Sequence, residues 1–139
     1  MPRHDDTLRL RGTEKSRYEH DSLTERIIGC AVEVHRHLGP GLIESSYEQA
    51  LCIELTSRRL SFQRQIEVPV FYKGELIGAH RLDLVVEERV VVELKSVDRL
   101  LGLHQAQALM YMRLLKLSVG LVLNFNTGLL KDGIRRLAL

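Results

Sequence analysis

The stretch LDLVVEERVVVELKS, residues Leu82 to Ser96, decides the fold of this chain. Both of its halves are rich in Val and Leu and predict β-strands, and the polar segment between them predicts a hairpin turn. Because a strand alternates its faces, the two charged residues around Leu94 point the same way and Leu94 points oppositely. Three charged residues thus lie inside apolar strands in the pattern D…E-x-K: Asp83, Glu93 and Lys95.

The register of the hairpin places Asp83 relative to Glu93. If the loop is Glu87-Glu88-Arg89, with Val86 opposite Val90, the two carboxylates pair on one face. A two-residue loop would separate them, so we favour the three-residue loop or a bulge, although such loops prefer a glycine that is missing here. The expected apolar face then holds Leu82, Leu84, Val86, Val90, Val92 and Leu94, and the other face holds Asp83, Val85, Val91, Glu93 and Lys95.

Two carboxylates and a lysine on one sheet face allow two interpretations. They are costly to bury without partners, so one interpretation is a salt-bridged polar face of a half-exposed antiparallel sheet. The other is a hard-cation site, in which carboxylate oxygens bind Mg²⁺ or Mn²⁺ together with waters. In that site the lysine would stabilise or activate the attacking water. The three residues alone do not decide between the two.

Length and composition are those of one globular domain. The chain has 139 residues, of which 45% are hydrophobic and 27% charged, enough for a real core. A net charge of +2 and a pI of about 8.7 neither require nor exclude nucleic acid. There is no membrane-length apolar run, no signal-peptide pattern and no CxxC around Cys30 or Cys52. We therefore expect a cytoplasmic protein with buried reduced thiols and neither membrane contact nor zinc.

The N-terminal half predicts an arm and two helices. Residues 1–21 are polar and of mixed charge, which predicts a flexible arm before a domain of residues 22–139. The capping box Ser22-Leu23-Thr24-Glu25 predicts the start of a helix that Gly39-Pro40-Gly41 ends. A second helix is expected from about Glu44 to Leu60, with Tyr47, Leu51 and Leu55 facing inward.

Glu44 opens that second helix and allows two interpretations. An acidic residue in the first turn complements the helix dipole, which would make Glu44 structural. Because the inward face of the helix packs against the sheet, Glu44 could instead be a third acidic group aimed at the metal site.

Further strands complete the sheet. Gln65–Tyr72 predicts an edge strand, because Pro69 cannot donate to a ladder. The segment from Leu76 onward leads to Asp83, so the first three strands are expected to form an antiparallel meander. Ser118–Phe125 predicts a buried central strand and Ile134–Leu139 a last strand.

Leu103–Leu117 predicts a helix between the meander and the buried strand. Gln107 and Tyr111 lie one turn apart on it and could project their polar ends towards the site. The alternative for Tyr111 is a core residue with a satisfied hydroxyl.

This order of elements and charged residues resembles the PD-(D/E)XK nuclease superfamily, whose core is αβββαβ. The stretch Gly41-Leu42-Ile43-Glu44-Ser45-Ser46-Tyr47 matches the G-x-x-E-x-x-Y signature of one branch, the GxxExxY proteins. The segments around His35–Gly41, Asn124–Asn126 and Leu130–Ile134 also look like that branch. The resemblance covers Leu23 to Leu139 and implies a restriction-endonuclease-like α/β fold, with a mixed sheet flanked by helices.

The resemblance also implies roles for single residues. Asp83 and Glu93 would be the principal metal ligands, the Leu94 carbonyl a further ligand, and Lys95 would position or activate water. Glu44 would complete the acidic cluster, although the choice between Glu44 and Glu48 stays open. Gln107 and Tyr111 look like the Q-x-x-x-Y motif of the recombination-exonuclease branch, which contacts substrate phosphate. Leu82 stands where the superfamily name has proline, at a position that varies.

We therefore expect a metal-dependent nuclease that hydrolyses phosphodiester bonds with Mg²⁺ or Mn²⁺, on DNA ahead of RNA. One alternative is a catalytically silent nuclease-like binding or regulatory module. Another is a subunit that cuts only within a complex. Related folds often pair to cut two strands, so a homodimer is one candidate state. The sequence does not specify the substrate sequence, exo- or endonuclease polarity, or the pathway.

Overall fold

The structure is a computed structural model that describes the backbone of residues 12–139 and the side chains of residues 22–139. One five-stranded mixed sheet has the order β1-β2-β3-β4-β5. β1, β2 and β3 form an antiparallel meander, β4 runs parallel to β3, and β5 returns antiparallel to β4. The predicted α/β fold is confirmed. Its strands are β1 (Phe62–Tyr72), β2 (Glu75–Val86), β3 (Val90–Lys95), β4 (Val119–Asn124) and β5 (Ile134–Ala138).

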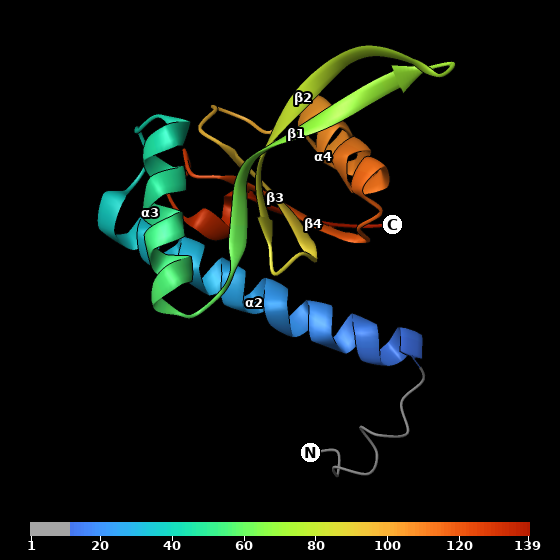
Figure 1. Cartoon of the computed structure of the whole chain (residues 1–139). Coiled ribbons are helices and arrows are strands. Elements are labelled where there is room, and N and C mark those ends of the chain that lie inside the picture. The colour runs from blue at the N-terminus through green and yellow to red at the C-terminus, as the bar shows by residue number, and fades with distance from the viewer. Residues whose placement is uncertain (1–11) are drawn as a thin grey trace.

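Helices cover both faces of this sheet (Figure 1). α2 (Gly12–Leu38) and α3 (Glu44–Ser57) pack on one face, and α4 (Gly102–Leu115) packs on the other. A short 3-10 helix, η1 (Leu130–Gly133), precedes β5. α4 is also the crossover that carries the chain from β3 to the parallel strand β4. β4 lies in the interior of the sheet between β3 and β5 and is almost wholly buried, so the prediction of a buried central strand is confirmed.

The hairpin between β2 and β3 has the predicted three-residue loop. Val86 pairs with Val90, and the next two pairs follow in register towards the middle of the strands. The loop contains no glycine, and Glu87 and Glu88 both adopt the left-handed conformation instead, with φ of 53° and 56°. The Glu87 carboxylate accepts hydrogen bonds from the backbone N–H and the hydroxyl of Ser61, which fixes the turn to the start of β1.

One residue of the predicted apolar face lies on the wrong side. Leu84 packs under α2 and α3 as expected, whereas Leu82 joins the cluster under α4. The β1–β2 register does not change at this point, because Arg64 pairs with Leu84 and Ile66 pairs with Leu82. Gln65 lies between these two pairs and has a left-handed φ of 50°, so β1 is irregular at the rung of Asp83, beyond the last β2–β3 pair.

The first helix begins earlier than predicted. α2 is already helical at Gly12, so the capping box at Ser22 lies inside the helix and does not mark its start. Residues 13–21 contain several good helix formers and no proline, so the chain has no stop signal before Ser22. Residues 12–21 of the predicted arm are thus helical in the structure. The flexibility of the arm stays a prediction, and its residues 1–11 lie outside the described residues.

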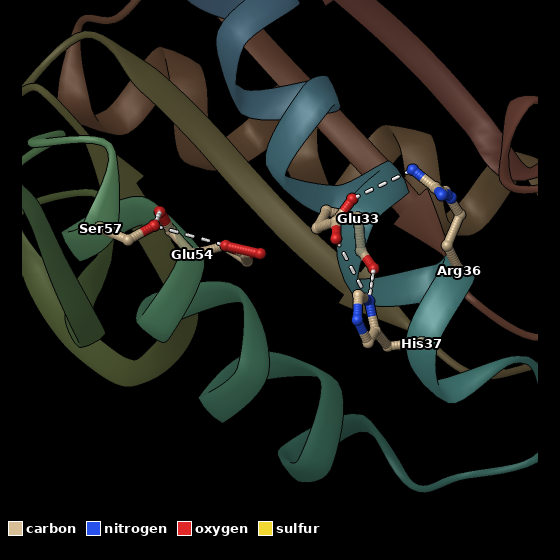
Figure 2. Close-up of polar contacts among 5 residues, drawn as sticks. All are labelled: Glu33, Arg36, His37, Glu54 and Ser57. Carbon is tan, nitrogen blue, oxygen red and sulfur yellow. Dashed lines mark hydrogen bonds and ion pairs between the residues drawn. The ribbon is translucent and has the colours of Figure 1, made fainter.

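The ends of α2 and α3 carry local hydrogen bonds on the outside of the fold. His37 and Arg36 both contact the Glu33 carboxylate one turn earlier, and Ser57 contacts Glu54 in the same way (Figure 2). α3 ends at Ser57 and not at Leu60. Leu60 still reaches the core because its N–H turns back to the Leu55 carbonyl at 2.9 Å.

Two further expectations concern thiols and membranes. Cys30 and Cys52 are buried and unpaired, as predicted. In the part of the chain that the structure describes, no helix combines the length and the apolar character that crossing a bilayer requires.

Candidate active site

The two predicted carboxylates meet where β2 separates from β3. The backbone ladder between these strands ends at the pair Leu84–Val92. At the next rung, the Asp83 N–H donates to Glu93 Oε1 at 3.0 Å, and the Leu94 N–H donates to Asp83 Oδ2 at 2.8 Å. Each carboxylate thus replaces a backbone acceptor of the other strand. Among the described residues, no backbone N–H donates to Asp83 Oδ1 or Glu93 Oε2.

Burial makes this pair of carboxylates electrostatically unusual. Glu93 is only 4% exposed. Its burial, followed by the charge of Asp83, raises the pKa of Glu93 to about 8. Burial also raises the pKa of Asp83, and the charges of Glu48 and Glu44 act in the same direction. The pair therefore favours a bound proton or a bound cation near neutral pH.

Lys95 lies on the same face as Glu93. Its ammonium nitrogen is 3.8 Å from Glu93 Oε2, and its side chain is 17% exposed. A lysine in this position partly compensates the two carboxylates, because its charge opposes the rise in both of their pKa values. The three residues of the D…E-x-K pattern are thus together, as the strand alternation predicts.

The two acidic residues at the start of α3 differ in their contacts. Glu48 is buried, and its carboxylate accepts hydrogen bonds from Arg64 Nε and Nη2 at 3.1 and 2.8 Å and from Gln65 at 2.6 Å. Glu44 is exposed and has no hydrogen bond or ion pair among the described residues, yet its charge acts on both Asp83 and Glu93. Glu44 is therefore the carboxylate that remains available.

α4 brings Tyr111 beside the carboxylates from the opposite layer. Tyr111 is 2% exposed, and its pKa is raised by burial and then by the charges of Glu93 and Asp83. Its ring lies edge-on to His80 of β2 at 6.4 Å between centroids. Gln107 is half-buried one turn earlier on the same helix. Tyr111 is thus both a core residue and a neighbour of the site.

Several supporting residues were not predicted as parts of the site. Arg64 and Gln65 both hold Glu48, and Gln65 does so from a left-handed backbone conformation for which the sequence carries no glycine signal. Asn124 is 2% exposed and binds both backbone groups of Val97, at 3.1 Å to the N–H and 2.9 Å to the carbonyl. A polar residue ending an apolar strand is the signal that could have indicated Asn124.

The donor set fits a small hard cation only in part. Mg²⁺ commonly takes one or two carboxylates and completes its shell with waters and substrate oxygens. Asp83 and Glu93 supply two such carboxylates within one hydrogen-bonded unit. Across the described residues, no three His, Cys, Asp or Glu side chains are close enough to form a complete cage. The residues thus suit an open, water-rich site and not an all-protein one.

Comparison with known proteins gives one result at the level of family. A sequence model of the PD-(D/E)XK nuclease superfamily matches residues 21–137. No curated protein and no solved structure matches the chain. The matched range covers β1 to β4, all of β5 except its last residue, and all of α3 and α4. With its paired carboxylates and neighbouring lysine at the predicted strand positions, the chain belongs to the PD-(D/E)XK nuclease superfamily.

Proposed function

We propose that this protein is a metal-dependent nuclease that hydrolyses phosphodiester bonds in DNA. The observation that carries the proposal is the Asp83–Glu93 pair, whose buried carboxylates have raised pKa values and lie beside the Lys95 ammonium group. A salt-bridged structural face would pair each acid with its own base, whereas here two acids share one lysine. Such a cluster is typical of catalytic sites.

We assign the metal-binding role to Asp83, Glu93, the Leu94 carbonyl and Glu44. The Leu94 N–H points to Asp83, and in an extended strand the carbonyl of a residue points to the same side as its N–H. Glu44 is preferred over Glu48 because Arg64 and Gln65 already occupy the Glu48 carboxylate. When bound, Mg²⁺ or Mn²⁺ would neutralise charge that develops on the phosphate.

The remaining roles concern water and substrate. Lys95 would hold the attacking water, because its ammonium group lies on the carboxylate face and donates only. Gln107 and Tyr111 would contact the substrate phosphate from α4, with Gln107 the more accessible of the two. We also propose, from the G-x-x-E-x-x-Y signature of residues 41–47, that the protein belongs to the GxxExxY branch of the superfamily.

Cleavage assays with matched variants test the proposal. The purified protein is incubated with single- and double-stranded DNA and RNA in Mg²⁺ or Mn²⁺. Asp83→Asn and Lys95→Ala are compared with Asp132→Asn and Lys131→Ala, which make the same changes at exposed positions of η1. We expect the site variants to lose at least about a hundredfold in rate and the η1 variants to match the wild type. Equal rates in all four variants and the wild type would contradict the proposal.

A second comparison separates Glu44 from Glu48. Glu44→Gln should weaken Mn²⁺ binding, measured by calorimetry, and leave the melting temperature unchanged because Glu44 is exposed. Glu48→Gln should lower the melting temperature, because it removes the buried carboxylate charge with which the partly exposed Arg64 pairs. The reverse pattern would assign the metal-binding role to Glu48.

A further inference from the structure

A polar cavity of about 390 Å³ opens next to the carboxylates. One wall is the loop of residues 41–43 together with Glu44, the first residue of α3. The other wall consists of Ser96 and Val97 after β3 and Asn126 after β4. Glu44 belongs both to this cavity and to the acidic cluster, and Ser96 directly follows Lys95. The volume lies at the lower end of the roughly 300–1,000 Å³ range of small-ligand sites.

The first wall is held rigid by Tyr47. The Tyr47 hydroxyl donates to the Gly39 carbonyl at 2.5 Å and accepts from the Leu42 N–H at 3.1 Å. Its ring stacks on Phe125, with centroids 4.5 Å apart. The Ser96 hydroxyl donates to the Leu42 carbonyl at 2.6 Å, so both backbone groups of Leu42 are used. The loop that opens α3 is therefore fixed across the mouth of the cavity.

The second wall is held at both sides of Asn126. The side-chain oxygen of Asn124 accepts hydrogen bonds from the Asn126 N–H at 3.2 Å and from the Val97 N–H. The Phe125 N–H donates to the Lys95 carbonyl at 2.9 Å, and the buried His35 contacts the Thr127 carbonyl at 2.8 Å. Asn126 thus sits on a fixed platform, which is how a recognition residue is held in place.

The protein groups that face the cavity suit a ligand that is neutral, planar and polar. Within the described residues the Asn126 side-chain amide has no hydrogen-bond partner, and it can both donate and accept. Glu44 is the charged side chain of the lining, so an isolated anion is disfavoured there. Leu42 and Ile43 are exposed at 40% and 70% and offer apolar surface beside these polar groups. An amide next to apolar surface is how proteins contact the edge and the face of a nucleobase.

We propose that this cavity receives one unpaired nucleobase of the substrate strand, next to the scissile phosphate, and that the Asn126 amide hydrogen-bonds to its edge. A base inside a duplex is stacked and paired, so it enters such a pocket only when it leaves the helix. The preferred substrate is therefore DNA with an unpaired nucleotide at the cleavage position. This inference rests on the proposed nuclease function.

The test combines changes in the protein with changes in the substrate. Oligonucleotide duplexes carry one unpaired nucleotide, either with a base or abasic, and are cleaved in Mn²⁺ by the wild type, Asn126→Ala and Gln63→Ala. Gln63 is an exposed amide on β1 outside the cavity and serves as the matched control. A third variant, Val97→Phe, narrows the cavity without changing a carboxylate. Melting temperatures of all variants are measured first.

On the substrate with a base, Asn126→Ala should reduce kcat/KM by about tenfold or more. On the abasic substrate, the kcat/KM of Asn126→Ala should equal that of the wild type. Val97→Phe should show the same dependence on the base, and Gln63→Ala should change neither value. Equal losses of Asn126→Ala on both substrates, or no loss on either, would overturn the proposal.

If the wild type cleaves nothing, the proposed nuclease function fails, but the cavity can still be tested separately. The same pairs of variants and substrates are then compared by DNA binding in Ca²⁺, measured by fluorescence anisotropy. Weaker binding by Asn126→Ala only when the base is present would support the cavity as a base site. An affinity that is independent of the base would reject it.

Discussion

Glu93 couples the candidate active site to the stability of the fold. Its pKa of about 8 lies above the ordinary value of 4.5 that applies in the unfolded chain. Between these two pH values the folded protein holds a proton that the unfolded chain has released. Stability is therefore expected to fall as pH rises from about 5 to 8, by up to about 1.4 kcal/mol per pH unit for one proton.

Denaturant unfolding at several pH values in the presence of a chelator measures this effect. Glu93→Gln should flatten the decline, because an amide cannot release the proton. The pKa of Glu87 is lowered by its hydrogen bonds to Ser61, so its contribution to stability increases as pH rises. That increase occurs below this pH window and does not mask the effect of Glu93. A wild-type protein whose stability stays constant or rises between pH 5 and 8 would show that Glu93 is already ionised in the fold.

Gly133 is the residue for which the packing around Asn124 leaves no room for a side chain. A Cβ atom there would lie 2.2 Å from the Asn124 carbonyl oxygen and 3.2 Å from the Asn124 Cβ. We expect Gly133→Ala to destabilise the protein by about 1–3 kcal/mol, because the neighbouring atoms belong to a fixed strand end. Gly128→Ala is the matched control, since nothing lies within 4 Å of that position. Similar melting temperatures for the two variants would contradict this packing.

Some residues of the candidate site could be predicted and others could not. Strand alternation was enough to place Asp83, Glu93 and Lys95 together, because the period of two is imposed by the backbone. It failed at Leu82, which packs under α4 although Leu84 packs under α2 and α3. The neighbouring β1 residue Gln65 is left-handed, and its side chain gives no local sign of that conformation. The contact of Gln65 with Glu48 could not be predicted for the same reason.

At the scale of elements, the β2–β3 turn has a conformation that its residues do not favour. Glu88 is exposed and has a φ of 56°, a region in which glycine avoids the cost of a side chain. Glu88→Gly should therefore raise the free energy of unfolding by about 0.5–1 kcal/mol. Glu88→Ala should give no such gain.

Glu87 provides the internal comparison for the same turn. It is also left-handed, but its carboxylate holds Ser61, so Glu87→Gly should gain less than Glu88→Gly or should destabilise. Chemical denaturation of the three variants measures the differences. A loss of stability in Glu88→Gly would mean that the left-handed conformation is not what strains this turn.

The boundaries of the elements were less predictable than their existence. The periodicity of apolar residues identified every described strand and α-helix, but the start of α2 was placed at a capping box that the helix passes through. A capping box shows that a helix can start at that residue. It must start there only if a helix-breaking residue stands before the box. The order αβββαβ was accessible because each segment has a distinct period, 2 for strands and 3.6 for helices.

At the scale of the whole molecule, the sheet is supported unevenly. β3 and β4 are buried from both faces, whereas β1 has one neighbouring strand and the β1–β2 hairpin extends past the other strands (Figure 1). All residues from 71 to 80 are exposed, including Phe71, Tyr72, Leu76 and Ile77 at 60–64%. Because the hairpin leaves the body of the sheet beside Asp83, its outer half lies beyond the candidate site and outside the packed core.

This uneven support predicts an uneven pattern of hydrogen exchange. Amides of residues 70–78 should exchange through local opening at low free energy, and those of β3 and β4 only near the free energy of global unfolding. Hydrogen-exchange mass spectrometry at low protein concentration measures both. Strong protection of the hairpin tip under these conditions would contradict the prediction. Protection that appears only as the concentration rises would instead show that the exposed apolar tips of two molecules pack together, because dilution acts on association and leaves the packing within one molecule unchanged.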